Sequence, residues 1–356
     1  MKLTRPVAAV AAALVSLSVV AQTIGIGSGV VAMRPSLFFR VNSYSLGAVN
    51  PGFSTSRIKT SAVATGPSSG GDFRIVCGTW KVDFSDPMVY PYQPGSSHAH
   101  VFFGNTAITG AMGPKELNNL RAIGAVRSTC AGGTENGSGY WTPPVVDHVS
   151  GQIILPSINL VYYKNGSTWR AANPTAVQAP PTGLRFIHGN PGNTTEGGVT
   201  SGMKWACFTP NPTPGLPRVQ QPFTLGIPPA STCPVGSELI QLLSMPTCWD
   251  GVHLDSPDHK SHMAVENDVT GCPITHPVVL PQFSFNLHYF VKAGQSTDRW
   301  RLASDNYTLA SPGGYSAHGD IVFAWNPPTI ELIVQKCLRE QRDCHANLLG
   351  DGRTLY

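Results

Sequence analysis

The chain has 356 residues and a formal net charge of +4, and only 12% of its residues are charged. Its lysines and arginines are scattered rather than arranged in a stripe, which excludes an electrostatic surface for nucleic acid. Hydrophobic residues make up 41% of the chain, too many for a disordered protein, and the 37 glycines and 31 prolines indicate many loops.

The first 21 residues have the features of a secretory signal peptide. Lys2 and Arg5 precede an apolar stretch that ends in Ala21 and is closed by Gln22, as a cleavage site requires. The stretch is too short for a transmembrane helix, which needs about 20 apolar residues. We therefore expect a secreted or periplasmic protein without a membrane span. Loss of Lys2 and Arg5 would reduce its net charge from +4 to +2.

The rest of the chain divides by composition into an extension, a main domain and a tail. Residues 22–70 end in a Gly/Ser-rich segment that is typical of a flexible linker. Residues 71–349 carry most of the strand patterns and are long enough for one large β domain. Residues 350–356 are expected to form a C-terminal tail.

Strand patterns dominate the main domain. Segments rich in β-branched and aromatic residues predict strands within 96–105, 151–163, 183–189, 281–291 and 318–325. In segment 281–291 large apolar residues alternate with polar ones, as in a strand with one buried face. Initial prolines predict helices over 114–124 and 328–341. We therefore expect a mainly β, β-sandwich-like single domain with one or two peripheral helices.

The cysteines indicate a disulfide-stapled fold. Their number is even and no CxxC pair occurs, which in an exported chain favours disulfides over structural zinc. The simplest hypothesis pairs them in sequence order. The four predicted bonds are Cys77–Cys130, Cys207–Cys233, Cys248–Cys272 and Cys337–Cys344.

Histidines and aspartates gather in three segments, which makes them candidates for a catalytic site. An HxH opens the strand pattern of 96–105, and an HGD opens that of 318–325. Residues two apart on a strand point to the same side, so each motif would direct both of its polar side chains into one space. The third segment is the polar stretch 249–263. The predicted cleft contains His98, His100, Asp258, His259, His262, His318 and Asp320.

Two chemistries use such groups. Imidazoles bind divalent transition metals, and His98, His100 and His318 are the candidate ligands. Without a metal, histidine and aspartate form a general acid–base pair. The competing interpretation is structural, with histidines that bond backbone carbonyls and a simple Gly-Asp turn at HGD. The candidate substrate-binding residues are Asn105, Lys260 and Arg185.

Four motifs in chain order resemble a family of exported bacterial and fungal proteins, domain of unknown function nineteen ninety-six. The motifs are SSHAHVFFGN, CWDGVHLDSPDHKSHM, CPITHPVVLPQFSF and HGDIVFAW, and the resemblance covers residues 72–345. It implies that the motifs form one unit, and it brings no established activity with it. The motif positions are His98, His100, Gly104, Asn105, Asp250, Asp255, Ser256, Asp258, His259, Ser261, His262, His276, Pro277, Gln282, His318, Gly319 and Asp320.

The favoured hypothesis is an exported enzyme that acts on an extracellular polysaccharide or cell-wall glycan, with or without a divalent metal. As a hydrolase it would need two carboxylates, such as Asp258 and Asp320, about 5 to 9.5 Å apart. As a lyase it would need a cation, Lys260 or Arg185, beside a uronate. The alternatives are a non-catalytic glycan-binding module that uses surface tryptophans, and a structural metal-binding protein with a closed site.

Overall fold

The structure is a computed structural model that describes residues 38–41, 51–64, 66, 70–122 and 126–356. The predicted signal peptide and much of the N-terminal extension lie outside these residues. Within the described ranges, no helix has the length and apolar character needed to cross a membrane.

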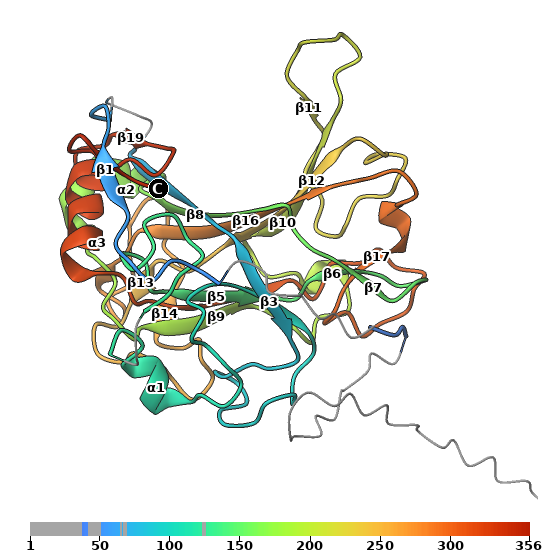
Figure 1. Ribbon diagram of the computed structural model, residues 1–356, viewed down its shortest axis with the longest axis horizontal. Helices are drawn as coiled ribbons and strands as arrows, with labels where there is room; N and C mark the ends of the chain where they lie inside the picture. Colours follow the sequence, from blue (N-terminus) through green and yellow to red (C-terminus); the bar gives the residue numbers. More distant parts are fainter. Residues whose placement is uncertain (1–37, 42–50, 65, 67–69, 123–125) are drawn as a thin grey trace, which may run out of the picture.

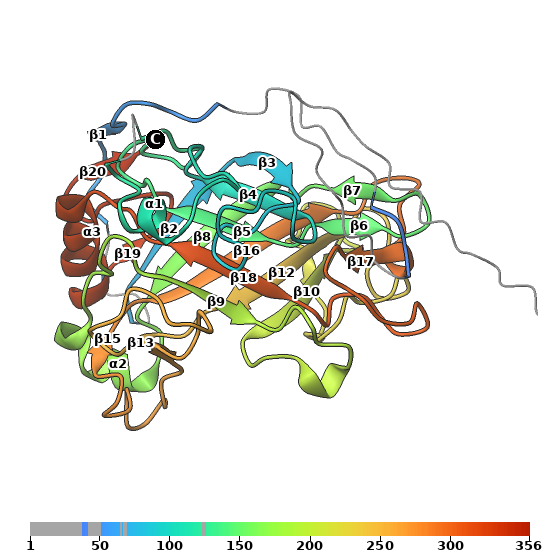
Figure 2. The ribbon, with the colours of Figure 1, turned by 90° about the horizontal axis from the view of Figure 1, so that it is seen from below.

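Two large sheets form the body of the protein, which is mainly β as the strand patterns predict (Figures 1 and 2). Neighbouring strands are antiparallel except for the short parallel pair at one edge of the larger sheet. The seven-stranded sheet contains, in order across the sheet, β11 (Val219–Gln220), β10 (Met203–Thr209), β12 (Glu238–Ser244), β16 (Gln282–Phe290), β8 (Ile158–Lys164), β2 (Asp72–Cys77) and β19 (Asp343–Cys344). The five-stranded sheet contains, in the same sense, β3 (Thr79–Asp83), β4 (His100–Gly104), β5 (Gly139–Thr142), β18 (His318–Val322) and β9 (Arg185–Gly189).

Three small sheets and a few helices surround this body. The small sheets are β14 (Met263–Ala264), β13 (Cys248–Trp249) and β15 (Val278–Val279); β17 (Trp300–Leu302), β6 (Val145–Asp147) and β7 (Gln152–Ile154); and β1 (Ile58–Thr60) with β20 (Arg353–Leu355). The α-helices are α1 (Pro114–Asn118), α2 (Thr168–Ala172) and α3 (Pro327–Ile333), and α3 continues as a π-helical segment, Val334–Arg339. Short 3-10 helices are Pro174–Ala176, Glu196–Gly198 and Thr297–Arg299.

The main core lies between the two large sheets. The alternation predicted for β16 is confirmed, since Phe283, Phe285, Leu287 and Tyr289 are all fully buried. Across the core, the ring of Phe283 lies 4.5 Å from that of Phe323, which directly follows β18. The sandwich-like fold therefore follows from apolar residues at every second position of the central strands.

The outer face of the five-stranded sheet is also covered. Phe102 of β4, Trp141 of β5 and Val322 of β18 form a second apolar cluster with Leu117 of α1 and Met88 of the preceding loop. Figure 1 shows α1 beside this sheet, away from the seven-stranded sheet. Side chains on the outer face are therefore enclosed, although they are not part of the main core.

The four disulfide bonds join the cysteines in sequence order, which confirms the predicted pairing. Both predicted helices form, although α1 ends at Asn118, and α2 is an additional helix that the sequence did not indicate. Strand β1 of the predicted extension pairs with β20 of the predicted tail. The two predicted end segments thus contact each other in the folded chain.

Candidate metal centre

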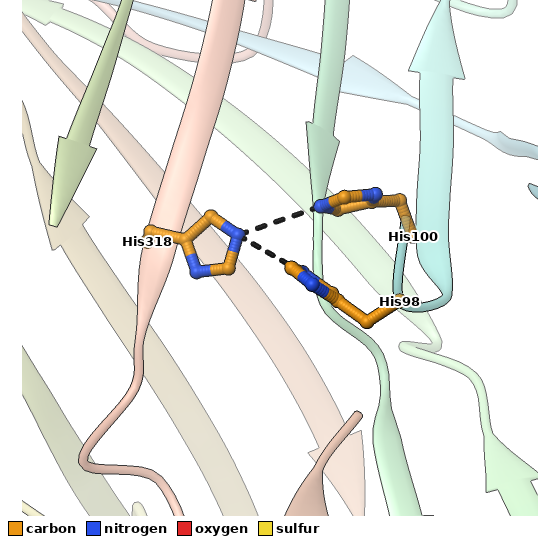
Figure 3. A group of neighbouring side chains, drawn as sticks. All are labelled: His98, His100 and His318. Carbon is orange, nitrogen blue, oxygen red and sulfur yellow. Dashed lines mark hydrogen bonds between the residues drawn. The ribbon is translucent and has the colours of Figure 1, made fainter. Parts of the chain in front are cut away.

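Three histidines from the HxH and HGD motifs meet on the outer face of the five-stranded sheet. His100 is the first residue of β4, His98 precedes it by two positions, and His318 is the first residue of β18. Figure 3 shows the HxH side chains extending toward His318 across the strand that lies between them. The alternation of side chains along a strand places His98 and His100 on the same side, as the HxH spacing predicts.

The side chains approach one another through the same ring nitrogen. The Nε2 atom of His318 lies 3.2 Å from Nε2 of His98 and 3.4 Å from Nε2 of His100. Two nitrogens bound at about 2.0–2.1 Å to one tetrahedral zinc ion would lie about 3.3–3.4 Å apart. Both distances therefore fit ligands of a single ion, and ligand nitrogens of all three rings lie within 4.8 Å of one another.

Backbone carbonyls fix the proton positions on two of these rings. Nδ1 of His100 lies 3.1 Å from the carbonyl oxygen of Ser85, and Nδ1 of His318 lies 2.8 Å from that of Ser316. Because a carbonyl oxygen can only accept, both Nδ1 atoms carry a proton and donate it. In the neutral rings, Nε2 of His100 and Nε2 of His318 therefore present lone pairs to each other. Histidine ligands of metals are commonly oriented by such Nδ1–H bonds.

Burial keeps these rings neutral. Burial lowers the pKa of His318 to about 4, with Lys260 acting in the same direction. Burial, followed by repulsion from the neighbouring histidines, also holds the pKa values of His98 and His100 well below their ordinary 6.5. At neutral pH the cluster thus contains neutral imidazoles, which is the form that binds metals.

Two glycines allow the backbone to form this arrangement. Gly189 of β9 has a φ of +100°, and an added Cβ would collide with the backbone of Ala317 and His318. Gly319 lies between His318 and Asp320, and a Cβ there would approach Phe285 of the main core to 3.0 Å. The HGD motif therefore needs its glycine because the inner face of β18 presses against the core.

A cavity of about 250 Å³ opens beside the histidines. His98 is only half-buried, and it lines this cavity together with His318. The remaining lining residues are Asp86, Val89, Tyr90, Ser96, Ser97, Ile187, Pro191, Ala303, Ser304, Asp305 and Asn306. The open side of the histidine cluster thus faces a space lined by both polar and apolar side chains, which could admit a small group or one unit of a polymer.

Asp320 lies close to this centre, with a second aspartate that the sequence patterns did not single out. Burial, with repulsion from Asp86, raises the pKa of Asp320 well above its ordinary value. Burial also raises the pKa of Asp86. Asp86 belongs to the loop after β3 and has no motif around it, so only the fold reveals its position.

The third predicted segment, 249–263, lies along the edge of the five-stranded sheet. The amide of Ile187 in β9 donates to the carbonyl of His259, and Nε2 of His262 lies 2.9 Å from the carbonyl oxygen of Arg185. The other ring nitrogen of His262 contacts the hydroxyl of Ser256 at 2.7 Å. Because both of its nitrogens are engaged, His262 fastens the loop to the sheet.

The remaining members of this segment also make local bonds. Oδ1 of Asp258 accepts bonds from the amides of Lys260 and Ser261, and Asp258 is exposed. The Nδ1 atom of His259 lies 2.8 Å from Asp255. None of these three predicted site residues, Asp258, His259 and His262, lines the cavity described above.

The predicted substrate-binding residues have other partners as well. Arg185 forms an ion pair with Asp255 at 3.0 Å, and Lys260 donates to the carbonyl of Gly189 at 2.8 Å. The side chain of Asn105 is buried and bonds the backbone of Ala107 and Gly137. The structure therefore unites His98, His100, His318 and Asp320, and gives the other predicted residues separate partners.

A separate group of one histidine and two carboxylates occurs at the edge of the seven-stranded sheet where β2 and β19 run parallel. His345 lies 3.3 Å from Asp72 and 2.8 Å from Asp343. All three side chains are partly exposed, and the ion pairs account for their proximity. This group gives no reason to place a second functional site there.

Comparison with known proteins identifies the family and adds no activity. Residues 86–325 match the family described as a domain of unknown function (DUF1996), which confirms the resemblance of the four motifs. The chain therefore belongs to this family. No curated protein and no solved structure matches it. The matched range begins at Asp86 and includes every residue of the histidine cluster.

Proposed function

We propose that this protein is an exported, metal-dependent hydrolase that acts on an extracellular polysaccharide, with a divalent ion on His98, His100 and His318. The observation that carries the proposal is the convergence of three Nε2 atoms while backbone carbonyls hold the Nδ1 protons of two rings. Opposed lone pairs repel unless a cation lies between them. When bound, such an ion activates a water molecule and polarises the bond to be broken.

The position of the cavity favours a catalytic ion over a structural one. Structural zinc sites are closed by four protein ligands, whereas catalytic sites combine three with an open position. Here His98 and His318 line a cavity, and the fully buried His100 lies behind them. A water or substrate atom could reach an ion at this place.

Hydrolysis is favoured over lyase chemistry by the placement of positive side chains. A lyase acting on a uronate would need a cation at the substrate carboxylate. Arg185 is paired with Asp255, and Lys260 is bonded to Gly189. Among the described residues that line the cavity, none is lysine or arginine. The cavity suits a neutral, hydroxyl-rich unit, for which the hydroxyl of Ser96 offers a hydrogen-bonding group.

The compartment supports an extracellular substrate. The four disulfides fit an oxidising environment, where polysaccharides of walls and matrices are found. A tryptophan-based glycan-binding surface has less support, because Trp141 and Trp205 are buried and no tryptophan of the described residues is among the exposed large side chains.

Metal content and activity should be measured together. The protein, expressed in an oxidising compartment and purified without histidine tag or chelator, should contain about one zinc ion per chain by elemental analysis. It should release reducing ends from a neutral polysaccharide, lose this activity with a chelator, and regain it with zinc. His98→Ala should lose both metal and activity, whereas the control His253→Ala, in an exposed loop, should keep both. A His98→Ala protein as active as the parent would refute the proposal.

A further inference from the structure

Two buried aspartates, Asp86 and Asp320, lie beside the three histidines, and a single ion on those rings does not explain the unpartnered carboxylate of Asp320. Asp320 follows His318 by two positions on β18, so its side chain lies on the same outer face, and it is fully buried. Asp86 is 4% exposed, and its Oδ1 accepts bonds from the amides of Met88 and Val89. One oxygen of each carboxylate and one nitrogen of His100 lie within 4.8 Å of one another.

Asp320 lacks the partners that a buried carboxylate needs. Neither of its oxygens has a hydrogen-bond partner among the described residues. Asp305, another buried aspartate at the cavity, shows the usual alternative, since its oxygens accept bonds from Gly314, Leu302 and Ser316. A buried carboxylate anion without such bonds is strongly unfavourable unless a cation compensates its charge, and without a cation the group takes up a proton instead. The nearby carboxylate of Asp86 further favours a bound cation at this place.

We propose that Asp86 and Asp320 bind a second divalent cation, adjacent to the ion that the proposed function places on the histidines. The two groups of ligands share only His100. Because Nδ1 of His100 faces the carbonyl of Ser85, its Nε2 atom is the one directed toward the metal centre. Asp86 lines the same cavity as His98 and His318, so both ions would border one space.

The histidine site and the aspartate site differ in the ions that they prefer. Imidazole nitrogens favour zinc and similar transition metals, whereas carboxylate oxygens favour magnesium, calcium or manganese. A site of three nitrogens beside a site of two carboxylates is thus suited to two different ions. Pairs of ions about 3.5–4 Å apart are known in hydrolytic enzymes, where they act together on one water and one substrate.

The stoichiometry of bound ions tests this inference in the full-length secreted protein. The zinc-loaded protein is titrated with Mn²⁺ by calorimetry, and bound zinc and manganese are then counted by elemental analysis. We expect one zinc and one manganese ion per chain. Asp320→Asn should keep its zinc and weaken manganese binding by about 100-fold or more, because a direct ligand is lost. This variant should fold, since an amide replaces a buried, unpartnered carboxylate of nearly the same shape.

Asp258→Asn serves as the control because Asp258 is an exposed aspartate in the adjacent loop and should not affect either ion. A parent protein with one zinc ion and no manganese would overturn the second site and leave the proposed function intact. Loss of zinc in Asp320→Asn would also overturn it, because Asp320 would then be a ligand of the first ion. A protein that binds neither ion would refute both proposals.

Discussion

Acidification of the metal-free protein should measure how strongly the fold keeps His318 neutral. Burial lowers its pKa to about 4, whereas in the unfolded chain it titrates near 6.5. Between these values the unfolded chain binds a proton that the folded chain does not, so acid favours unfolding. The stability that depends on neutral His318 is fully present above pH 6.5 and is lost as the pH falls to 4. The difference between the two pKa values corresponds to about 3 kcal/mol.

The perturbation that isolates this contribution is His318→Asn. Urea unfolding of metal-free parent and variant is followed from pH 7 to pH 4, and the free energies of unfolding are subtracted at each pH. The parent should lose about 3 kcal/mol more than the variant over this range. His318 also lowers the pKa values of His98 and His100. Its removal therefore also reduces the loss of stability that these two rings cause in acid, which enlarges the difference between parent and variant.

Protonation of the buried carboxylates changes the free energy of unfolding in the opposite direction, and it does so in both parent and variant. Burial raises the pKa values of Asp86 and Asp320, so their protonation favours the folded state as the pH falls. Because both residues are present in parent and variant, their contribution largely cancels in the subtraction. A difference that stays constant within about 1 kcal/mol would show that His318 titrates as an exposed imidazole does, and would refute the burial argument.

Three further changes test how the surrounding structure supports the centre. Gly189→Ala should reduce the zinc content of purified protein, because the added Cβ collides with the backbone of His318; unchanged zinc would contradict the close approach. His262→Ala should lower the free energy of unfolding by about 1–3 kcal/mol in urea while zinc content is kept, since it leaves buried partners unbonded. Removal of the Cys248–Cys272 disulfide, which joins residues 24 positions apart, should lower the free energy of unfolding by about 3.5 kcal/mol through loop entropy. Removal of Cys337–Cys344, with a separation of 7, should lower it by about 2.5 kcal/mol. Equal losses in the two disulfide variants would contradict the dependence on loop length.

The sequence predicted the elements whose patterns are local. Alternation in β16 and the side-by-side histidines of HxH both depend on spacing within a short segment. The helix α2 was not predicted, because Thr168–Ala172 is only five residues long and is held by the capping hydroxyl of Ser167. Such short helices depend on tertiary packing more than on propensity.

The polar loop 249–263 shows where composition was an incomplete guide. Its histidines and aspartates were predicted to join the cleft, yet His262 and Asp258 use their polar atoms to shape the loop and to fasten it to β9. Composition cannot distinguish a histidine that bonds a backbone carbonyl from one whose ring nitrogen is available to a ligand. Asp86 is the opposite case, a residue of the site that the sequence did not indicate. No motif surrounds it, and only folding buries it next to Asp320.

The meeting of His100 and His318 depends on the order and register of three strands. Val101 of β4 pairs with Thr142 of β5, and Asp320 of β18 pairs with Trp141. One further step along β4 and two further steps along β18 place His100 and His318 on opposite sides of the same residue, Pro143. Strands two positions apart in a sheet are separated by about 9.4–9.8 Å, and each imidazole spans part of that distance above β5. A shift of either strand by one residue would turn its histidine into the main core, so the centre requires this register as well as the two motifs.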